Sequence, residues 1–169
     1  MTIGYIGLGK MGHNMVLRLL EKKWRVVAYN RSPEPVRKIA RAGAIPAFTV
    51  SELVHQIKKP RLIWLMVPHK AVDEMLSKLL PKLSRGDVVI DGGNSHYVDT
   101  VRRAQRCAKF GVTMLDAGVS GGPRGARNGA CVMVGGSTVQ YKKYEKIFRD
   151  IAAPKSYAYM GASGAGHFV

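Results

Sequence analysis

The chain has 169 residues, 46% of them hydrophobic, and carries 27 Lys and Arg against 11 Asp and Glu, for a formal net charge of +16. This length suits one globular domain, and the mixed composition excludes a collagen-like, coiled-coil or largely disordered chain. The longest apolar runs are far shorter than the roughly 20 residues that a membrane-spanning helix needs, and no signal-peptide pattern opens the chain. Because there are only two cysteines, without CxxC spacing, we expect a cytoplasmic protein with two reduced thiols.

The positive charge indicates an affinity for anions, such as a phosphorylated small molecule or a nucleic acid. The basic residues are spread over several predicted helices, and most are interpreted as solvated helix faces. Nucleic-acid binding is the weaker alternative, because no recognition motif or aromatic platform accompanies the charge. We expect no membrane partner. The five histidines are scattered without ligand spacing, so no metal site is predicted.

The first part of the chain predicts a complete βαβ unit. Residues 2–6 form a short apolar strand that ends in glycine, residues 10–22 place apolar side chains on one side of a helix, and residues 25–29 form the next strand. A Ser-Pro pair at 32–33 is typical of a helix N-terminus, and Gly43 marks the end of that helix.

The alternation of strand and helix continues along the rest of the chain. The predicted strands are 62–67, 87–90, 112–116, 131–134 and 156–160, and the predicted helices are 49–57, 71–80, 98–109 and 141–151. The glycine-rich residues 118–136 indicate several turns around the short strand they contain. This order predicts an α/β protein with a Rossmann-type, doubly wound, mostly parallel sheet and helices on both faces.

Three glycines after the first predicted strand, Gly7, Gly9 and Gly12, match the GxGxxG fingerprint. The first permits a tight turn, the second lets the backbone approach a diphosphate, and the third allows helix and strand to pack closely. The diphosphate would lie at the helix N-terminus, where unpaired N–H groups and the helix dipole favour an anion. The motif therefore predicts a dinucleotide cofactor.

The end of the second predicted strand favours NADP over NAD. NAD-binding domains usually place Asp or Glu there for the ribose hydroxyls, whereas this chain has Asn30, Arg31 and Ser32. A carboxylate would repel a 2′-phosphate, but a guanidinium beside amide and hydroxyl groups would bind it through charge-assisted hydrogen bonds.

Two more glycine-flanked segments, DGGNS and DAGVSGG, follow predicted strands, where ligands bind in sheets of this kind. In the first, Asn94 offers an amide that can donate and accept hydrogen bonds. In the second, Ser120 offers a hydroxyl, and Gly121 and Gly122 could present backbone N–H groups to a carboxylate or carbonyl oxygen.

Six segments together resemble the N-terminal domain of 6-phosphogluconate dehydrogenases. They are GLGKMG at 7–12, NRS at 30–32, MVPH at 66–69, DGGNS at 91–95, DAGVSGG at 116–122 and GASGAGHFV at 161–169. The resemblance covers the whole chain, and DGGNS and GAGHFV are its most specific elements. GxGxxG and SGG also occur in related β-hydroxyacid dehydrogenases, including 3-hydroxyisobutyrate dehydrogenase.

The resemblance implies an NADP-dependent oxidoreductase of the pentose phosphate pathway. It would oxidise the C3 hydroxyl of 6-phosphogluconate, a phosphorylated sugar acid, and then release carbon dioxide and ribulose 5-phosphate. The NADP contacts that it implies are Gly7, Leu8, Gly9, Lys10, Met11, Gly12, Asn30, Arg31, Ser32, Val67, Pro68, His69 and Asn94. The substrate contacts that it implies are Asn94, Ser120, Gly121 and Gly122.

The family's catalytic lysine would follow Val169, so no catalytic residue is expected within the chain. The resemblance also implies that the family's helical domain, which usually carries the dimer interface, is absent. We therefore expect residues 1–169 to bind NADP but to turn over poorly or not at all alone, and the full-length protein to be a homodimer. His96 and His167 are the nearest candidate bases, although a histidine beside glycine is more often a polar turn residue.

Two other functions fit the same residues. The first is a different β-hydroxyacid dehydrogenase, such as 3-hydroxyisobutyrate dehydrogenase, acting on a small acid without a phosphate. The second is a non-catalytic module that binds NADP.

Overall fold

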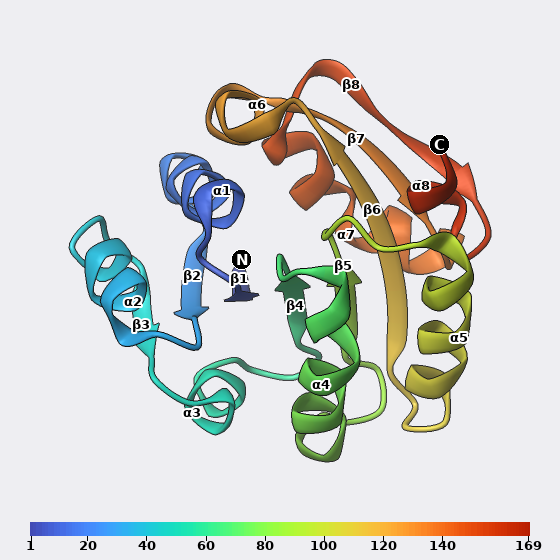
Figure 1. Cartoon of the computed structure of the whole chain (residues 1–169), viewed down its shortest axis with the longest axis horizontal. Coiled ribbons are helices and arrows are strands. Elements are labelled where there is room, and N and C mark those ends of the chain that lie inside the picture. Colours follow the sequence, from blue (N-terminus) through green and yellow to red (C-terminus); the bar gives the residue numbers. More distant parts are fainter.

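The computed structural model describes all 169 residues and contains one eight-stranded sheet with the order β3-β2-β1-β4-β5-β6-β7-β8 (Figure 1). The strands are β1 (Thr2–Ile6), β2 (Arg25–Tyr29), β3 (Ile45–Ala47), β4 (Leu62–Leu65), β5 (Val88–Asp91), β6 (Thr113–Ser120), β7 (Ala130–Gly135) and β8 (Ala152–Gly161). All neighbouring strands are parallel except β6 and β7. This arrangement confirms the predicted Rossmann-type, mostly parallel sheet.

Helices cover both faces of the sheet, as predicted. They are α1 (Lys10–Glu21), α2 (Pro33–Ala40), α3 (Val50–His55), α4 (His69–Leu79), α5 (Tyr97–Ala108), α6 (Gly122–Asn128), α7 (Thr138–Ile151) and α8 (Ala165–Phe168), with a 3-10 turn at Leu80–Lys82. One buried apolar cluster joins the sheet to α1, α2, α6 and α7, and a second joins it to α3, α4 and α5. None of the helices has both the length and the apolar character needed to cross a lipid bilayer.

Alternating side chains of the central strands divide between the two clusters. In β4, Leu62 and Trp64 belong to the cluster under α1 and α7, whereas Ile63 and Leu65 belong to the cluster under α3 and α4. A strand that is buried on both faces needs a continuous apolar run, because successive side chains point to opposite faces. This explains why the run in β4 has no polar interruption.

Two helices begin at residues that are typical N-caps. Thr49 caps α3, since its hydroxyl accepts from the backbone N–H of Glu52 at 3.0 Å, while the Glu52 carboxylate accepts from the backbone N–H of Phe48 at 2.7 Å. Ser32 also occupies the N-cap position of α2, with Pro33 first in the helix, but its side chain makes no capping hydrogen bond. The Ser32 hydroxyl is therefore free to bind a ligand beyond the carboxyl end of β2.

The structure corrects several predicted boundaries, mostly in the glycine-rich part of the chain. The segment interpreted as turns contains helix α6, and β6 continues through Ser120, where the prediction ended it at residue 116. The last strand begins at Ala152 rather than 156. The short β3, which pairs with β2, was not predicted.

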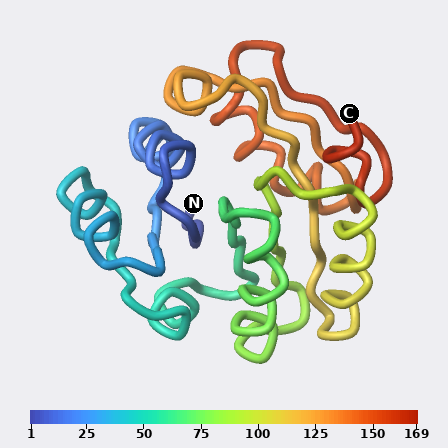
Figure 2. The backbone as a smooth tube through the Cα atoms, in the orientation of Figure 1, coloured from blue at the N-terminus to red at the C-terminus, as the bar shows by residue number.

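The first and fourth strands lie side by side inside the sheet, where the chain order reverses. Ligands of doubly wound sheets bind beyond the carboxyl ends of such strands. The backbone trace also shows the C-terminal segment folding back beside α5, β6 and β7 (Figure 2). Because β1, β4, β5 and β6 are parallel, the loops that follow them lie together beyond the carboxyl ends of these strands.

Candidate functional site

The turn after β1 is closely packed at two of its three glycines. Gly7 has a φ of +102°, and a Cβ atom there would lie 2.2 Å from the carbonyl oxygen of Met66. A Cβ atom on Gly12 would lie 1.9 Å from the carbonyl oxygen of Gly7. Because both contacts are with backbone atoms that cannot move aside, only glycine fits at these two positions.

Gly9 differs from the other two glycines. A Cβ atom there would have no neighbour within 4 Å, and Gly9 is the N-cap of α1. No side chain caps this helix, and its first turn contains no acidic residue. The first N–H groups of a helix lack intrahelical acceptors, so this terminus offers an open, positively polarised surface to an anion.

Asn30 connects the end of β2 to this turn. Its side-chain oxygen accepts from the backbone N–H of Leu8 at 3.0 Å, and its side-chain nitrogen donates to the carbonyl oxygen of Ser32 at 3.2 Å. The amide thus holds the glycine-rich turn and the segment after β2 in a fixed relation. Leu8 and Asn30 therefore contribute to the site by fixing the position of the glycine-rich turn.

A cleft of about 320 Å³ lies beside these segments and is called the β1–β4 cleft here. It brings together seven of the predicted cofactor residues: Gly7, Gly9, Asn30, Arg31, Ser32, Val67 and Pro68. The remaining lining comes from Ile6, Tyr29, Met66, Ala71, Glu74, Met75 and Lys78. The lining residues that come from α4 were not predicted, because their spacing indicates only an amphipathic helix.

The charges in the β1–β4 cleft favour an anion near the end of β2. Arg31 is exposed and makes no ion pair. The one carboxylate of the lining, Glu74, is bound by Lys78 at 2.6 Å, and this hydrogen bond lowers the pKa of the Glu74 carboxyl. The segment after β2 itself contributes no acidic group.

A second cavity of about 350 Å³ lies beyond the ends of β5 and β6 and is called the β5–β6 cavity. It brings Asn94 and Ser120 together with Met11 at the start of α1. Its other lining residues are Met66, Gly92, Gly93, Gly118, Val119, Met133, Gly166, His167 and Val169. Met66 and the start of α1 thus separate this cavity from the β1–β4 cleft.

A buried network supports the loop that carries Asn94. The Asp91 carboxylate accepts from the backbone N–H of Gly93 at 3.0 Å and from the Ser95 hydroxyl at 2.7 Å. Arg103, which is 2% exposed, donates to Ser95 at 3.3 Å and to the carbonyl oxygen of His69 at 2.9 Å. One guanidinium therefore connects the start of α4 to the loop after β5.

The C-terminal turn depends on a second buried carboxylate, Asp116. Its two oxygens accept from the backbone N–H groups of Gly164 at 2.8 Å and His167 at 3.0 Å. The His167 ring is held by Thr100 at 2.8 Å. The sequence placed Asp116 at a strand end but did not reveal this role, since the contact joins residues that are about 50 positions apart.

Several predicted residues lie outside the two cavities. Leu8 and Lys10 line a separate groove between α1 and α2, and Gly12 is buried beneath the glycine-rich turn. His69, Gly121 and Gly122 line neither cavity. His69 starts α4, and the two glycines start α6 immediately after Ser120.

Comparison with known proteins identifies the family. The family described as the NAD binding domain of 6-phosphogluconate dehydrogenase matches residues 2–161. A Haloferax volcanii protein named 6-phosphogluconate dehydrogenase, NAD(+)-dependent, decarboxylating, is 46% identical over 171 residues, covering 100% of this chain and 56% of that protein. A Saccharomyces cerevisiae protein named 6-phosphogluconate dehydrogenase, decarboxylating 2, is 39% identical, covering 99% of this chain and 36% of that protein.

Solved structures agree with this assignment. The Plasmodium falciparum 6-phosphogluconate dehydrogenase, described in apo form and in complexes with its cofactor NADP+ and its substrate 6-phosphogluconate, superposes with a TM-score of 0.92. It is 36% identical, and the match covers 99% of this chain and 38% of that one. The chain spans about a third to just under three-fifths of the length of its curated relatives. From these matches and the geometry above, the chain belongs to the family of NAD-binding domains of 6-phosphogluconate dehydrogenase.

Proposed function

We propose that this chain is the NADP-binding domain of a decarboxylating 6-phosphogluconate dehydrogenase. The observation that carries the proposal is the uncapped N-terminus of α1 behind the open position at Gly9, next to a strand end that has an arginine and no carboxylate. The backbone N–H groups of the turn would bind the diphosphate, and Arg31 with Ser32 would bind the 2′-phosphate.

The coenzyme preference has a direct test. Arg31→Asp places a carboxylate where a 2′-phosphate would lie, so we expect NADPH affinity to fall at least about tenfold while NADH affinity changes little or rises. Both affinities can be measured by titration of the purified chain. Arg149→Asp, an equal charge change on the exposed face of α7, serves as the control and should leave the NADPH-to-NADH ratio within about twofold. An unchanged ratio in the Arg31 variant would refute the NADP assignment.

A second candidate, NAD as the natural coenzyme, is favoured by one observation. The Haloferax volcanii relative, which is 46% identical, is named as NAD(+)-dependent. With NAD, the Asn30 amide and the Ser32 hydroxyl would bind the free ribose hydroxyls, and Arg31 would be a solvated side chain. The wild-type titration separates the two candidates, since a preference for NADH supports this one.

For the substrate, we propose 6-phosphogluconate, bound in the β5–β6 cavity. The Asn94 amide and the Ser120 hydroxyl face one cavity and could hydrogen-bond hydroxyl or carboxylate groups of a sugar acid. Gly121 and Gly122, which follow Ser120, would add backbone N–H groups at the cavity's outer edge. The bound nicotinamide would accept the hydride, while these residues orient the sugar acid.

The reaction itself needs a base near the alcohol. The β5–β6 cavity has no Lys, Asp or Glu in its lining, and His167 is its one titratable side chain. We therefore expect the 169-residue chain to bind coenzyme without appreciable oxidation of 6-phosphogluconate. NADPH formation followed at 340 nm, with and without 6-phosphogluconate, checks this expectation. Steady turnover by the chain alone would overturn it.

A further inference from the structure

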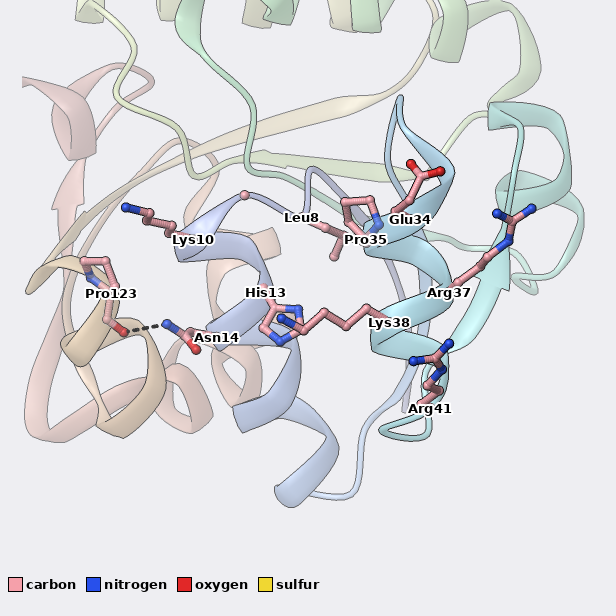
Figure 3. A pocket seen from close by; sticks show the side chains of 11 residues that line it. Leu8, Lys10, His13, Asn14, Glu34, Pro35, Arg37, Lys38, Arg41 and Pro123 are labelled. Carbon is pink, nitrogen blue, oxygen red and sulfur yellow. Dashed lines mark hydrogen bonds between the residues drawn. The ribbon is translucent and has the colours of Figure 1, made fainter.

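A groove of about 840 Å³ separates α1 from α2 on the outer surface of the domain (Figure 3). It is called the α1–α2 groove here. It is lined by Leu8, Gly9, Lys10, His13, Asn14, Glu34, Pro35, Arg37, Lys38, Arg41 and Pro123. Gly9 is the only residue that it shares with the β1–β4 cleft. The groove is therefore a distinct concave surface on the other side of the glycine-rich turn.

The cationic groups of the groove lack partners. Lys10, Lys38 and Arg41 make no ion pair with any carboxylate of the chain, and Glu34 is the one acidic residue of the lining. Arg37 points away from the groove centre and lies over the Phe48 ring instead (Figure 3). The groove thus concentrates positive charge that the fold itself does not neutralise.

The basic side chains of the groove follow one another across it. Lys10 lies at one end, His13 and Lys38 meet in the middle, and Arg41 lies at the other end (Figure 3). Lys38 and Arg41 are three residues apart, which is about 4.5 Å along a helix axis. A ligand that satisfies all of them must carry several negative charges in a row rather than a single one.

The middle of the groove shows the effect of this charge. Partial burial and the nearby Lys38 ammonium both lower the pKa of the His13 imidazole. The Lys38 ammonium lies beside the His13 ring with no carboxylate between them and no hydrogen bond joining the two side chains (Figure 3). An anion placed between Lys38 and His13 would accept from both and would favour the protonated imidazole.

We propose that the α1–α2 groove is a binding site for a linear polyphosphate, separate from the dinucleotide site. The Lys38 and Arg41 side chains would form charge-assisted hydrogen bonds to successive phosphoryl groups, and Lys10 would bind the end nearest to the glycine-rich turn. The lining contains no Phe, Tyr or Trp. It therefore offers no stacking surface for bases, which distinguishes it from a site for single-stranded nucleic acid.

Calorimetric titration of the chain with inorganic tripolyphosphate, without any dinucleotide, tests the proposal. We expect saturable one-site binding, weakened at least about tenfold in Lys38→Gln/Arg41→Gln. The control is Lys142→Gln/Arg149→Gln, which removes the same charge from the exposed face of α7 and should change the affinity by less than about twofold. Circular dichroism melting shows whether each variant is folded.

A second measurement locates the ligand. Tripolyphosphate should shift the NMR signals of the His13 ring and raise its pKa, whereas the His55 ring, on α3, should be unaffected. The proposal is overturned if both double variants lose affinity equally, because the binding is then due to net charge alone. It is also overturned if the His13 signals stay in place, or if double-stranded DNA binds more tightly through the same two residues. Failure of coenzyme binding would leave these results unchanged.

Discussion

At the residue scale, Gly9 and Gly12 provide a matched pair, because the same added methyl group meets open space at one and backbone at the other. Gly9 has φ −64° and ψ −172°, which alanine adopts freely. We expect Gly9→Ala to unfold in urea within about 0.5 kcal/mol of the wild type. It should still lower NADPH affinity at least about tenfold, since the methyl group lies where the diphosphate would approach.

Gly12→Ala, in contrast, should destabilise the fold. Its methyl group would lie 1.9 Å from the carbonyl oxygen of Gly7, so α1 and the turn must separate. We expect a loss of more than about 2 kcal/mol in the free energy of unfolding, as for other overpacked positions. Equal stabilities of the two variants would contradict this account of the turn.

The two thiols differ in burial, and we expect them to differ in reactivity for this reason. Cys107 lies on the buried face of α5, and burial raises the pKa of its thiol to about 11, whereas Cys131 is exposed on β7. Since the thiolate is the reactive form, Ellman's reagent should titrate one thiol per native chain and two in denaturant. Cys131→Ser should remove the native reaction, and Cys107→Ser should leave it. Rapid native labelling of Cys107 would show that α5 opens easily.

At the element scale, Arg103 connects the start of α4 with the loop after β5, so its contribution to coenzyme binding should exceed that of its neighbour Arg102. Both bind Asp73, but only Arg103 reaches His69 and Ser95. Lysine cannot reproduce a guanidinium fork. We therefore expect Arg103→Lys to weaken NADPH binding about five- to tenfold and Arg102→Lys less than about twofold. If both substitutions weaken binding equally, the effect arises from Asp73 rather than from the connection between α4 and the loop after β5.

The elements that the sequence predicted well are those whose burial leaves a clear pattern. Strands β1 and β4 and helix α1 combine continuous or periodic apolar residues with a glycine or proline at a boundary, and β2 has a continuous apolar run. Helix α6 was missed because its sequence, GPRGARN, has two glycines and a proline and buries only Ala126. Its place is set by packing against α1, which no local pattern records.

For the candidate site, too, the sequence indicated the segments that carry a local motif but not the residues that support them. The glycine turn and the segment after β2 could be identified because each carries a local motif, and the β1–β4 cleft brings them together. The supporting groups could not be identified, because Arg103 and Asp116 act through contacts with residues 34 and 51 positions away. An arginine on a basic helix and an aspartate at a strand end are common for other reasons.

At the scale of the whole molecule, an excess of positive charge surrounds a few bound carboxylates. Asp73 is the most connected of them. Its hydrogen bonds with Arg102, followed by those with Arg103, hold the pKa of its carboxyl well below the ordinary value. A depressed pKa means that the unfolded chain binds the proton more readily, so this interaction stabilises the fold above about pH 4 and is lost as the pH falls further. Added protons also increase the net positive charge, and the resulting repulsion acts in the same direction.

Acid unfolding therefore tests how much of the stability depends on this group. We expect the free energy of unfolding in urea to fall between about pH 5 and pH 3 for the wild type. Asp73→Asn should be less stable than the wild type at neutral pH, and the difference should narrow toward pH 3, where the wild-type carboxyl begins to protonate in the unfolded chain. Asp99→Asn is the matched control, since Asp99 also binds Arg102, at 3.2 Å, but does not contact Arg103. Its difference from the wild type should be small at both pH values. A constant gap between Asp73→Asn and the wild type would mean that the Asp73 side chain acts by packing rather than by charge.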